Sequence, residues 1–287
     1  MEILKYEFMR HALAAGLLTS IICGIMGTLV VVNRIVFLSG GIAHAAYGGI
    51  GMAFYFNWPV IPSTMGFSLV ASLVMAAVTL NNRQRADTVI GVIWAVGMAF
   101  GIILVDLTPG YNVDLMSYLF GSILTVPGSD LMIMGVIGAL ILFLVVFFYK
   151  ELMAISYDEE FAGLRGLPVR GIYFSLIAML GFTVVMVIQV VGLIMVIALL
   201  TIPPFMMEKY ARSLGAMMAG SSLLGACFTM AGLYLSYRFD LTSGAAIIMV
   251  AGTAFLVTLG VEKIWGFLPR TLQPESYKAN IMSTNKE

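Results

Sequence analysis

Charged side chains are so widely spaced in this chain that the gaps between them decide what it can fold into. Only 10% of its 287 residues are Asp, Glu, Lys or Arg, whereas 61% are hydrophobic. The long uncharged runs are residues 11–33, 35–82, 88–105, 131–149, 171–207, 213–237 and 241–261. A helix needs roughly 20 apolar residues to cross a bilayer, and these runs are near that length or long enough for two crossings. With a mean hydropathy of +1.01, the pattern indicates an integral membrane protein.

The runs predict an all-α polytopic membrane protein with about nine transmembrane helices, within a range of eight to ten. Run 171–207 is too long for one crossing and is expected to turn near Gln189 and Gly192. The continuous apolar runs do not alternate in polarity as membrane β-strands do. Segment 115–129 is too short for a crossing and suits an interfacial or re-entrant helix. The expected spans are 12–32, 35–56, 64–80, 88–105, 131–149, 171–188, 190–207, 214–236 and 244–262.

Lysine and arginine positions predict the orientation, because cytoplasmic loops are enriched in these residues. With the N-terminus outside and nine crossings, every Lys and Arg except Lys5, Arg10 and Arg238 falls on the cytoplasmic side. The C-terminus is then cytoplasmic. We expect one transmembrane domain over residues 1–267, with a cytoplasmic loop at about 150–170. Residues 268–287 are expected to form a polar, flexible cytoplasmic tail.

Composition and motifs exclude several functions. Lys+Arg and Asp+Glu are both 15, so no basic field points to nucleic acid. The two cysteines, Cys23 and Cys227, lie in apolar runs and do not form a disulfide scaffold. Residues 38–41, Leu-Ser-Gly-Gly, match part of a nucleotide-contacting signature, but the chain contains no Gly-x-x-x-x-Gly-Lys-Ser/Thr loop. The chain is therefore expected to be neither an ATPase nor an enzyme of another kind.

His44 is the polar residue of greatest interest, because it falls near the middle of the second expected span. Ionisable side chains at this depth usually face a bundle interior or a water-filled cavity. The small residues around it, including Gly40 and Gly41, allow close helix approach or leave space beside the imidazole. A neutral imidazole also binds transition metals well. The alternative is a packing histidine that is hydrogen-bonded to a neighbouring helix.

Loop 150–170 contains the signals of a short helix outside the membrane. Ser156 or Asp158 could cap it, and Glu159 and Glu160 would lie in its first turn, where negative charge is favourable. Gly163, Gly166 and Pro168 offer stop signals. Such a helix would present Phe161 and Leu164 for docking to a partner. A solvated connector is the alternative.

A proline pair marks the seventh expected span near its cytoplasmic end. Pro203 and Pro204 remove two backbone N–H donors, which either forms a hinge or ends the helix. We favour the hinge, since freed carbonyl groups are tolerated where neighbouring helices or water satisfy them.

Several motifs together resemble the membrane permease subunit of the ABC-3 family, the prokaryotic manganese, zinc and iron importers. They occur in that family's order between about residues 8 and 265. The matching segments are 8–13, 34–49, 87–91, 111–115, 119–124, 158–162, 189–192, 198–203, 235–237 and 243–245. The segment 34–49 includes the Ala-His pair that ends at His44, followed by small residues.

The resemblance implies a multi-pass protein of the prokaryotic plasma membrane that dimerises with a second copy of itself. Two cytoplasmic ABC ATPase subunits would use ATP and Mg, and an extracytoplasmic solute-binding protein would deliver a divalent metal. This chain would bind no cofactor of its own and no nucleic acid. Loop 150–170 would be the coupling segment to the ATPase, and His44 a ligand or gate on the translocation pathway.

One position departs from the family's pattern. Family members commonly have Asp where this chain has Gly40, one helical turn before His44. A lone imidazole suits a softer ion than Mn²⁺, or further ligands would come from Tyr47, Cys23, a methionine or backbone carbonyls. A chelated or organic cargo stays open as well.

An ion-gradient-driven secondary transporter is the alternative from another class. Such proteins tend to place paired acids at membrane depth. Here five acids fall at span ends or in loops, which weakens that interpretation. They are Asp87, Asp106, Asp114, Asp130 and Asp240.

Overall fold

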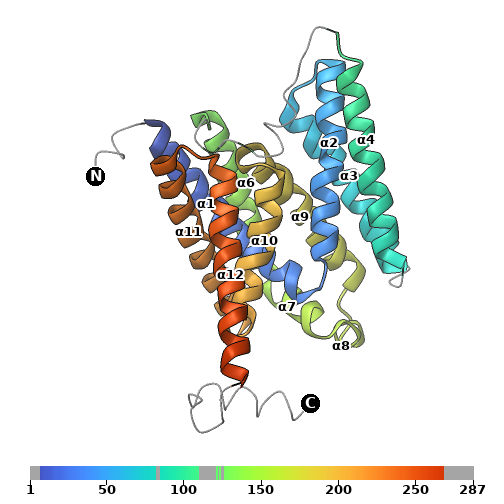
Figure 1. The fold of residues 1–287 in the computed structure, drawn as a ribbon. Coiled ribbons are helices and arrows are strands. Elements are labelled where there is room, and N and C mark those ends of the chain that lie inside the picture. Colours follow the sequence, from blue (N-terminus) through green and yellow to red (C-terminus); the bar gives the residue numbers. More distant parts are fainter. Residues whose placement is uncertain (1–6, 82–84, 110–120, 122, 124–125, 268–287) are drawn as a thin grey trace.

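Helices make up nearly all of residues 7–81, 85–109 and 126–267, which, with residues 121 and 123, are the part of the chain that the computed structural model describes (Figure 1). Those residues contain no strand. The helices are α1 (Glu7–Val32), α2 (Val36–Phe56), α3 (Val60–Asn81), α4 (Ala86–Asp106), α6 (Gly128–Phe147), α7 (Tyr149–Tyr157), α8 (Glu159–Leu164), α9 (Val169–Val191), α10 (Leu193–Glu208), α11 (Leu214–Phe239) and α12 (Ser243–Phe267).

The prediction of a polytopic helical membrane protein is confirmed. Among the described residues, 8 helices are long and apolar enough to cross a membrane, and each coincides with an expected span. The ninth expected span, 190–207, corresponds to α10, which has only 16 residues. At 1.5 Å per residue α10 is about 24 Å long, somewhat short of a bilayer core of about 30 Å. The prediction for 115–129 falls largely outside the described residues, as does that for the tail.

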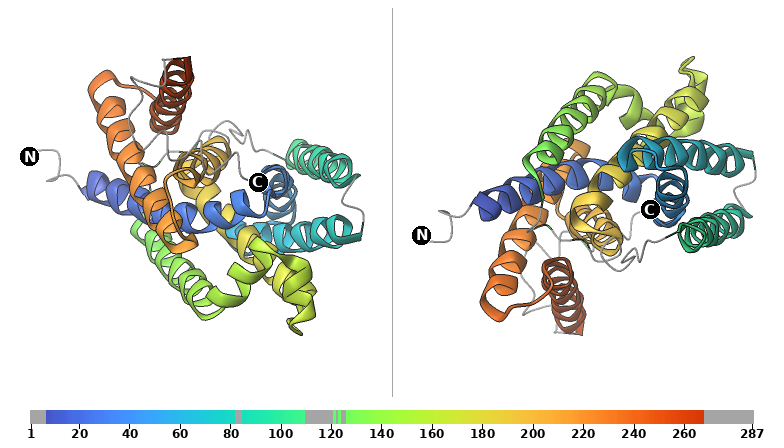
Figure 2. Two further views of the ribbon diagram at one scale, coloured as in Figure 1. Left: turned by 90° about the horizontal axis from the view of Figure 1, so that it is seen from below. Right: turned by 90° about the horizontal axis from the view of Figure 1, so that it is seen from above.

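The helices form two groups that α9 joins. On one side α2 packs against α3 and α4, and on the other α1 packs against α10 and α11, with α12 outside them. The two further views show α9 between these groups (Figure 2). Since α9 contacts α1, α2, α3, α6 and α10, it is the main connection across the bundle.

The turn between α9 and α10 confirms the predicted division of the long uncharged run. Gly192 has φ 82°, in the left-handed region that glycine adopts without steric cost. Its backbone N–H donates to the carbonyl of Ile188 at 2.9 Å, which ends α9. The chain then reverses direction, so α9 and α10 lie antiparallel (Figure 1).

Glycines allow α2 and α4 to approach almost backbone to backbone. A Cβ atom at Gly97 would lie 3.1 Å from the Cα of Ala45, and one at Gly101 would collide with the carbonyl of Tyr47. A collision with a backbone cannot be relieved by a side-chain movement, so Gly101 must stay small, and at Gly97 a side chain would be tightly confined. The register of α4 on α2 is thereby fixed, and it brings Trp94 beside His44.

Candidate functional site

His44 lies on α2 beside the ring of Trp94. The two ring centroids are 4.1 Å apart with an interplanar angle of 19°, so the rings stack. His44 is half-buried, and its Nδ1 atom is buried without a hydrogen-bond partner among the described residues. A hydrogen bond from Nδ1 to a neighbouring helix is therefore not seen, and the role of His44 on a translocation pathway stays a prediction. An uncommitted ring nitrogen is what a metal ligand or a proton carrier needs.

Gly40 lies one helical turn before His44 and leaves space next to it. A Cβ atom at Gly40 would meet only Ile197 of α10, at 3.9 Å, which is an ordinary contact distance. The next residue differs, since a Cβ at Gly41 would lie 2.5 Å from Ile90 of α4. Position 40 can thus accept a side chain, whereas position 41 cannot without a shift of Ile90.

Few conventional ligands accompany His44. The described residues contain no group of three or more His, Cys, Asp and Glu side chains that could hold a metal ion. Cys23 is fully buried in α1, and that helix packs mainly on α10 and α11. Tyr47 follows His44 on the same face of α2, at the i+3 position, and its side chain is buried. In this conformation the site offers one imidazole and, around it, small and aromatic residues.

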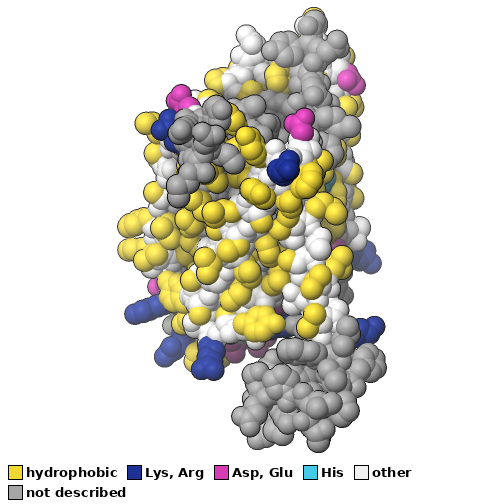
Figure 3. All heavy atoms as spheres, turned by 60° about the vertical axis from the view of Figure 1, so that its left-hand side comes forward, with side chains coloured by type: hydrophobic (Ala, Val, Ile, Leu, Met, Phe, Trp, Pro, Cys, Tyr) yellow, Lys and Arg dark blue, Asp and Glu magenta, His cyan; other side chains and the backbone are white. Residues whose placement is uncertain are grey.

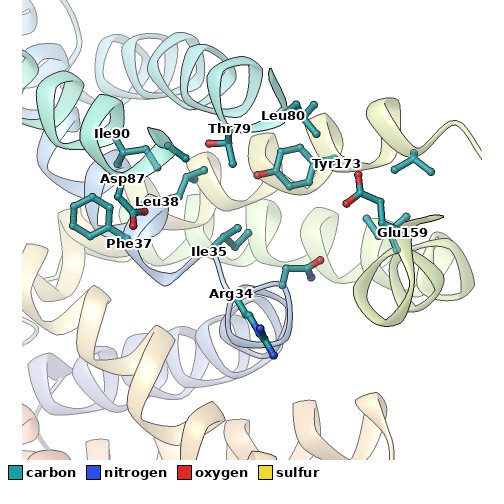
Figure 4. Close-up of a pocket in the computed structure, with 14 residues that line it drawn as sticks. Arg34, Ile35, Phe37, Leu38, Thr79, Leu80, Asp87, Ile90, Glu159 and Tyr173 are labelled. Atoms are coloured by element: carbon teal, nitrogen blue, oxygen red, sulfur yellow. The ribbon is translucent and has the colours of Figure 1, made fainter. Parts of the chain in front are cut away.

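A cavity of about 320 Å³ opens at the end of the bundle where α2 and α4 begin. Its polar lining residues come from four helices and one turn (Figure 4). They are Asn33, Arg34, Thr79, Asp87, Glu159 and Tyr173. Phe37, Leu38 and Ile90 form part of the apolar wall. The cavity therefore joins the start of the His44 helix to the start of α8.

The predicted short helix in loop 150–170 is confirmed as α8. The Oδ1 atom of Asp158 accepts a hydrogen bond from the backbone N–H of Phe161 at 2.8 Å, so Asp158 is the N-cap. The backbone N–H groups of Gly166 and Leu167 donate to the carbonyls of Gly163 and Ala162, with φ 80° at Gly166. This is a Schellman motif, which satisfies the terminal carbonyl groups and ends the helix.

Two large apolar side chains of α8 point away from the protein. Phe161 is 53% exposed and Leu164 is 87% exposed. They lie three residues apart and therefore share one face of α8, while Ala162 is buried against the rest of the protein. The guanidinium carbon of Arg165 lies 5.3 Å from the centre of the Phe161 ring. An exposed apolar pair on a well-capped helix outside the spans suits a docking surface.

Ser156, the alternative cap, has another role, so that part of the prediction is wrong. Its hydroxyl donates to the carbonyl of Leu152 and accepts from the Asn33 side-chain amide, each at 2.7–2.8 Å. The same amide also donates to the carbonyl of Leu29 at the end of α1. These bonds attach α7 to the turn between α1 and α2, where Arg34 has φ 57°.

The prolines do not end α10. Pro203 and Pro204 are buried inside the helix, which continues to Glu208. Pro204 has no N–H to give to the carbonyl of Leu200, and that carbonyl packs against Gly27 of α1, where a Cβ would collide with it. The helix-end interpretation is therefore wrong, and the hinge remains a prediction.

Sequence reasoning missed Trp94 and Asn33. Trp94 carried a signal, since tryptophans of membrane proteins usually lie at the interfaces and this one lies near the middle of an uncharged run. Asn33 is the last uncharged residue before Arg34 and has no local signal for its bond to Ser156.

Comparison with known proteins extends over most of the chain. The sequence profile of the ABC 3 transport family matches residues 5–262. An uncharacterized membrane protein of Synechocystis sp. is 52% identical over 262 residues, covering 91% of this chain and 93% of that protein. The manganese transport system membrane protein MntC of Halalkalibacterium halodurans is 29% identical over 269 residues, covering 94% of this chain and 92% of that protein. The solved structure of PsaBC from Streptococcus pneumoniae in complex with Fab aligns with a TM-score of 0.80 and 30% identity, over 89% of this chain and 92% of that chain.

Proposed function

Because this chain belongs to the ABC 3 transport family, we propose that it is the permease of an importer that moves a divalent transition-metal ion into the cytoplasm. It is a multi-pass protein of the prokaryotic plasma membrane. The observation that carries the proposal is His44, whose buried Nδ1 has no partner among the described residues in the middle of a span. Manganese is the first candidate ion, because similar proteins are named for manganese transport. Zinc and iron are tested beside it.

Helix α8 and the family membership support the proposed partners. Phe161 and Leu164 form an apolar pair that an ATPase subunit would cover, and Asp158, Glu159 and Glu160 hold the first turn of the helix that presents them. We propose two such ATPase subunits on a homodimer of this chain, with ATP and Mg bound by the ATPase. An extracytoplasmic solute-binding protein would deliver the ion.

The distribution of basic residues supports an extracytoplasmic N-terminus. Lys and Arg side chains gather around the lower end of the face in Figure 3. The turns and helix ends at that end of the bundle contain Arg34, Arg85, Lys150, Arg165, Arg170, Lys209, Arg212 and Lys263. Under the positive-inside rule this end, which also holds α8 and the cavity, is cytoplasmic.

A chelated or organic cargo is the second candidate. It is favoured by the absence of a three-residue ligand group among the described residues and by the space next to Gly40. A bulky cargo would use that space and would bring its own metal ligands. Membership of an ABC family argues against the gradient-driven alternative.

Uptake of Mn, Zn and Fe into whole cells tests the proposal. The permease would be expressed with its ATPase and solute-binding protein, as wild type and as His44→Ala. We expect the wild type to take up one of the three ions and His44→Ala to fall to background at an unchanged protein level. His11→Ala is the matched control, since His11 is the other histidine, is also half-buried and lies near the start of α1.

The outcomes separate the two candidates. Normal metal uptake by His44→Ala would reject the pathway role of His44. An assembled complex that hydrolyses ATP but takes up none of the three ions would favour the chelated or organic cargo.

A further inference from the structure

The cavity and His44 lie on one line along α2. Phe37, in the first turn of α2, lines the cavity, and His44 follows two helical turns later, about 10 Å further along the axis. Ile90, in the second turn of α4, also lines the cavity, and Trp94 follows one turn later. The two helices therefore lead from the cavity toward the same level of the membrane.

Trp94 contacts both His44 and Phe37, the residue of α2 that lines the cavity. Its ring stacks on His44 at 4.1 Å and also contacts Phe37, with the ring centroids 6.0 Å apart and an interplanar angle of 51°. Phe37 is 43% exposed although it belongs to a membrane-spanning helix, and part of its surface lines the cavity. A solute that moves along α2 from His44 toward the cavity thus meets Trp94 first and Phe37 second.

Apolar groups flank this aromatic pair on the sides that face the neighbouring helices. Leu38 is buried beside it, and Gly41 lets Ile90 and Met75 approach α2 at the same level. On the side of α10, the side chain of Ile197 would lie 3.9 Å from a Cβ atom added at Gly40. A layer of hydrocarbon and aromatic groups disfavours water and hydrated ions, and channels use such constrictions as gates.

We propose that Phe37 and Trp94 form the closed barrier between His44 and the cavity, and that the cavity is the vestibule through which the cargo leaves. This inference rests on the proposed function for the direction of transport. Glu159, the first residue of α8, lines the same cavity. A displacement of α8 by the ATPase would therefore change the shape of the vestibule directly below the barrier.

Cysteine accessibility tests the barrier without requiring transport. His44→Cys would be introduced with Cys227→Ser, because Cys227 is exposed whereas Cys23 is buried. Inside-out vesicles that contain the permease with its ATPase would be treated with a membrane-impermeant methanethiosulfonate reagent. We expect background labelling with both aromatics present, and a rise of about tenfold or more with Trp94→Ala or Phe37→Ala. Trp94→Phe keeps a large ring and should keep labelling low.

Two further variants serve as controls. Thr79 lines the cavity, so Thr79→Cys should react in the same vesicles. Its reaction in each variant background also shows that the protein is folded. Phe143→Ala removes an aromatic that stacks on Phe147 on the outer surface of α6, where it is 62% exposed, and should leave labelling at position 44 unchanged.

Three results would overturn the inference. Fast labelling of His44→Cys with both aromatics intact would remove the barrier. Background labelling in the Phe37→Ala/Trp94→Ala double variant, with Thr79→Cys reactive, would place the barrier elsewhere. An unreactive Thr79→Cys would show that the cavity does not open to the cytoplasm. The proposed function is tested by a different experiment, the uptake assay, in which normal metal uptake by His44→Ala would contradict it.

Discussion

The middle of α2 and the short helix α8 depart from their surroundings in opposite ways. In α8, outside the spans, the capping groups are hydrogen-bonded, yet the large apolar side chains of Phe161 and Leu164 face outward. In α2, inside a span, the ionisable side chain of His44 lies among small and apolar residues of the same helix. Its Nδ1 atom has no hydrogen-bond partner among the described residues. Exposing large apolar side chains to water is unfavourable, and so is placing an ionisable side chain inside the bilayer.

The difference teaches where to look for function in a membrane protein of this kind. Exposed apolar side chains on α6 and α12, such as Val136 and Leu256, need no explanation, because lipid is their solvent. Leu164 is equally apolar but belongs to a helix outside the spans, so its exposure supports the docking role proposed for α8. The residue type matters less than whether it suits the surrounding medium. The two helices that carry these sites, α2 and α8, line one cavity through Phe37 and Glu159.

Removing the exposed apolar pair should have the largest effect on assembly. Phe161→Ala and Leu164→Ala should each cost about 2 kcal/mol of ATPase binding, as central apolar anchors do, or roughly a 30-fold loss of affinity. The double variant should not be recovered with its ATPase in a pull-down from membranes. The stability of the permease itself should not fall, since both side chains are exposed.

Leu223→Ala is the matched control for that experiment. Leu223 is 68% exposed on α11, in a span, and lipid should replace the lost contacts. Recovery of the ATPase with the Phe161→Ala/Leu164→Ala variant at the wild-type level would contradict the docking role of α8.

Adding a carboxylate beside His44 should change which metal ion the site in α2 prefers. Gly40→Asp places an oxygen ligand one turn from the imidazole, in a position where its Cβ meets only Ile197 at 3.9 Å. Because Mn²⁺ favours oxygen ligands, uptake of Mn relative to Zn should rise by about tenfold, or ~1.4 kcal/mol. Competitive uptake of the two ions measures this ratio.

The neighbouring glycine provides the control for Gly40→Asp. At Gly41 a Cβ would lie 2.5 Å from Ile90, so Gly41→Asp should lower the amount of folded protein rather than change selectivity. An unchanged Mn-to-Zn ratio in a well-expressed Gly40→Asp protein would show that the cargo is not coordinated at His44.

The features that could be predicted from the sequence are those that depend on residues close together along the chain. The spans follow from hydropathy, the short helix α8 from a capping residue before two acids, and the turn at Gly192 from a glycine in an overlong apolar run. Each of these depends on residues close in sequence, so one sequence suffices. The choice between Ser156 and Asp158 already exceeded that reach, because Ser156 bonds to Asn33, which belongs to the end of α1.

The contacts that complete the site are set by packing between helices. Trp94 meets His44 because Gly97 and Gly101 fix the register of α4 on α2, and nothing in either segment alone specifies that register. The space next to Gly40 depends likewise on Ile197 of α10. The helix α7 was missed for a different reason, since it follows α6 almost without interruption and its polar residues resemble a loop.

Removing the N-cap of α8 should have a smaller effect than removing its apolar pair. Asp158→Ala deletes the acceptor for the Phe161 N–H and should destabilise the short helix by about 1 kcal/mol. ATPase recovery should fall only a few-fold in a titrated pull-down, and Asp158→Ser, which keeps a capping oxygen, should restore it. A loss as large as that of Phe161→Ala would mean that Asp158 contacts the ATPase itself.

The smallest expected effect comes from the hydrogen bond between Ser156 of α7 and Asn33 in the turn before α2. Ser156→Ala removes one hydrogen bond from Asn33, which keeps its bond to the carbonyl of Leu29, so thermal stability should fall by only about 0.5 kcal/mol. If α7 transmits the movement of α8 to the start of α2, uptake per ATP hydrolysed should fall about twofold while ATPase recovery stays constant. Ser129→Ala, at an exposed serine that bonds to its neighbour Asp130, serves as the control. If uptake per ATP hydrolysed is the same in Ser156→Ala and Ser129→Ala, the turn at Asn33 does not transmit the movement of α8. The movement would then reach α2 through the cavity and α9.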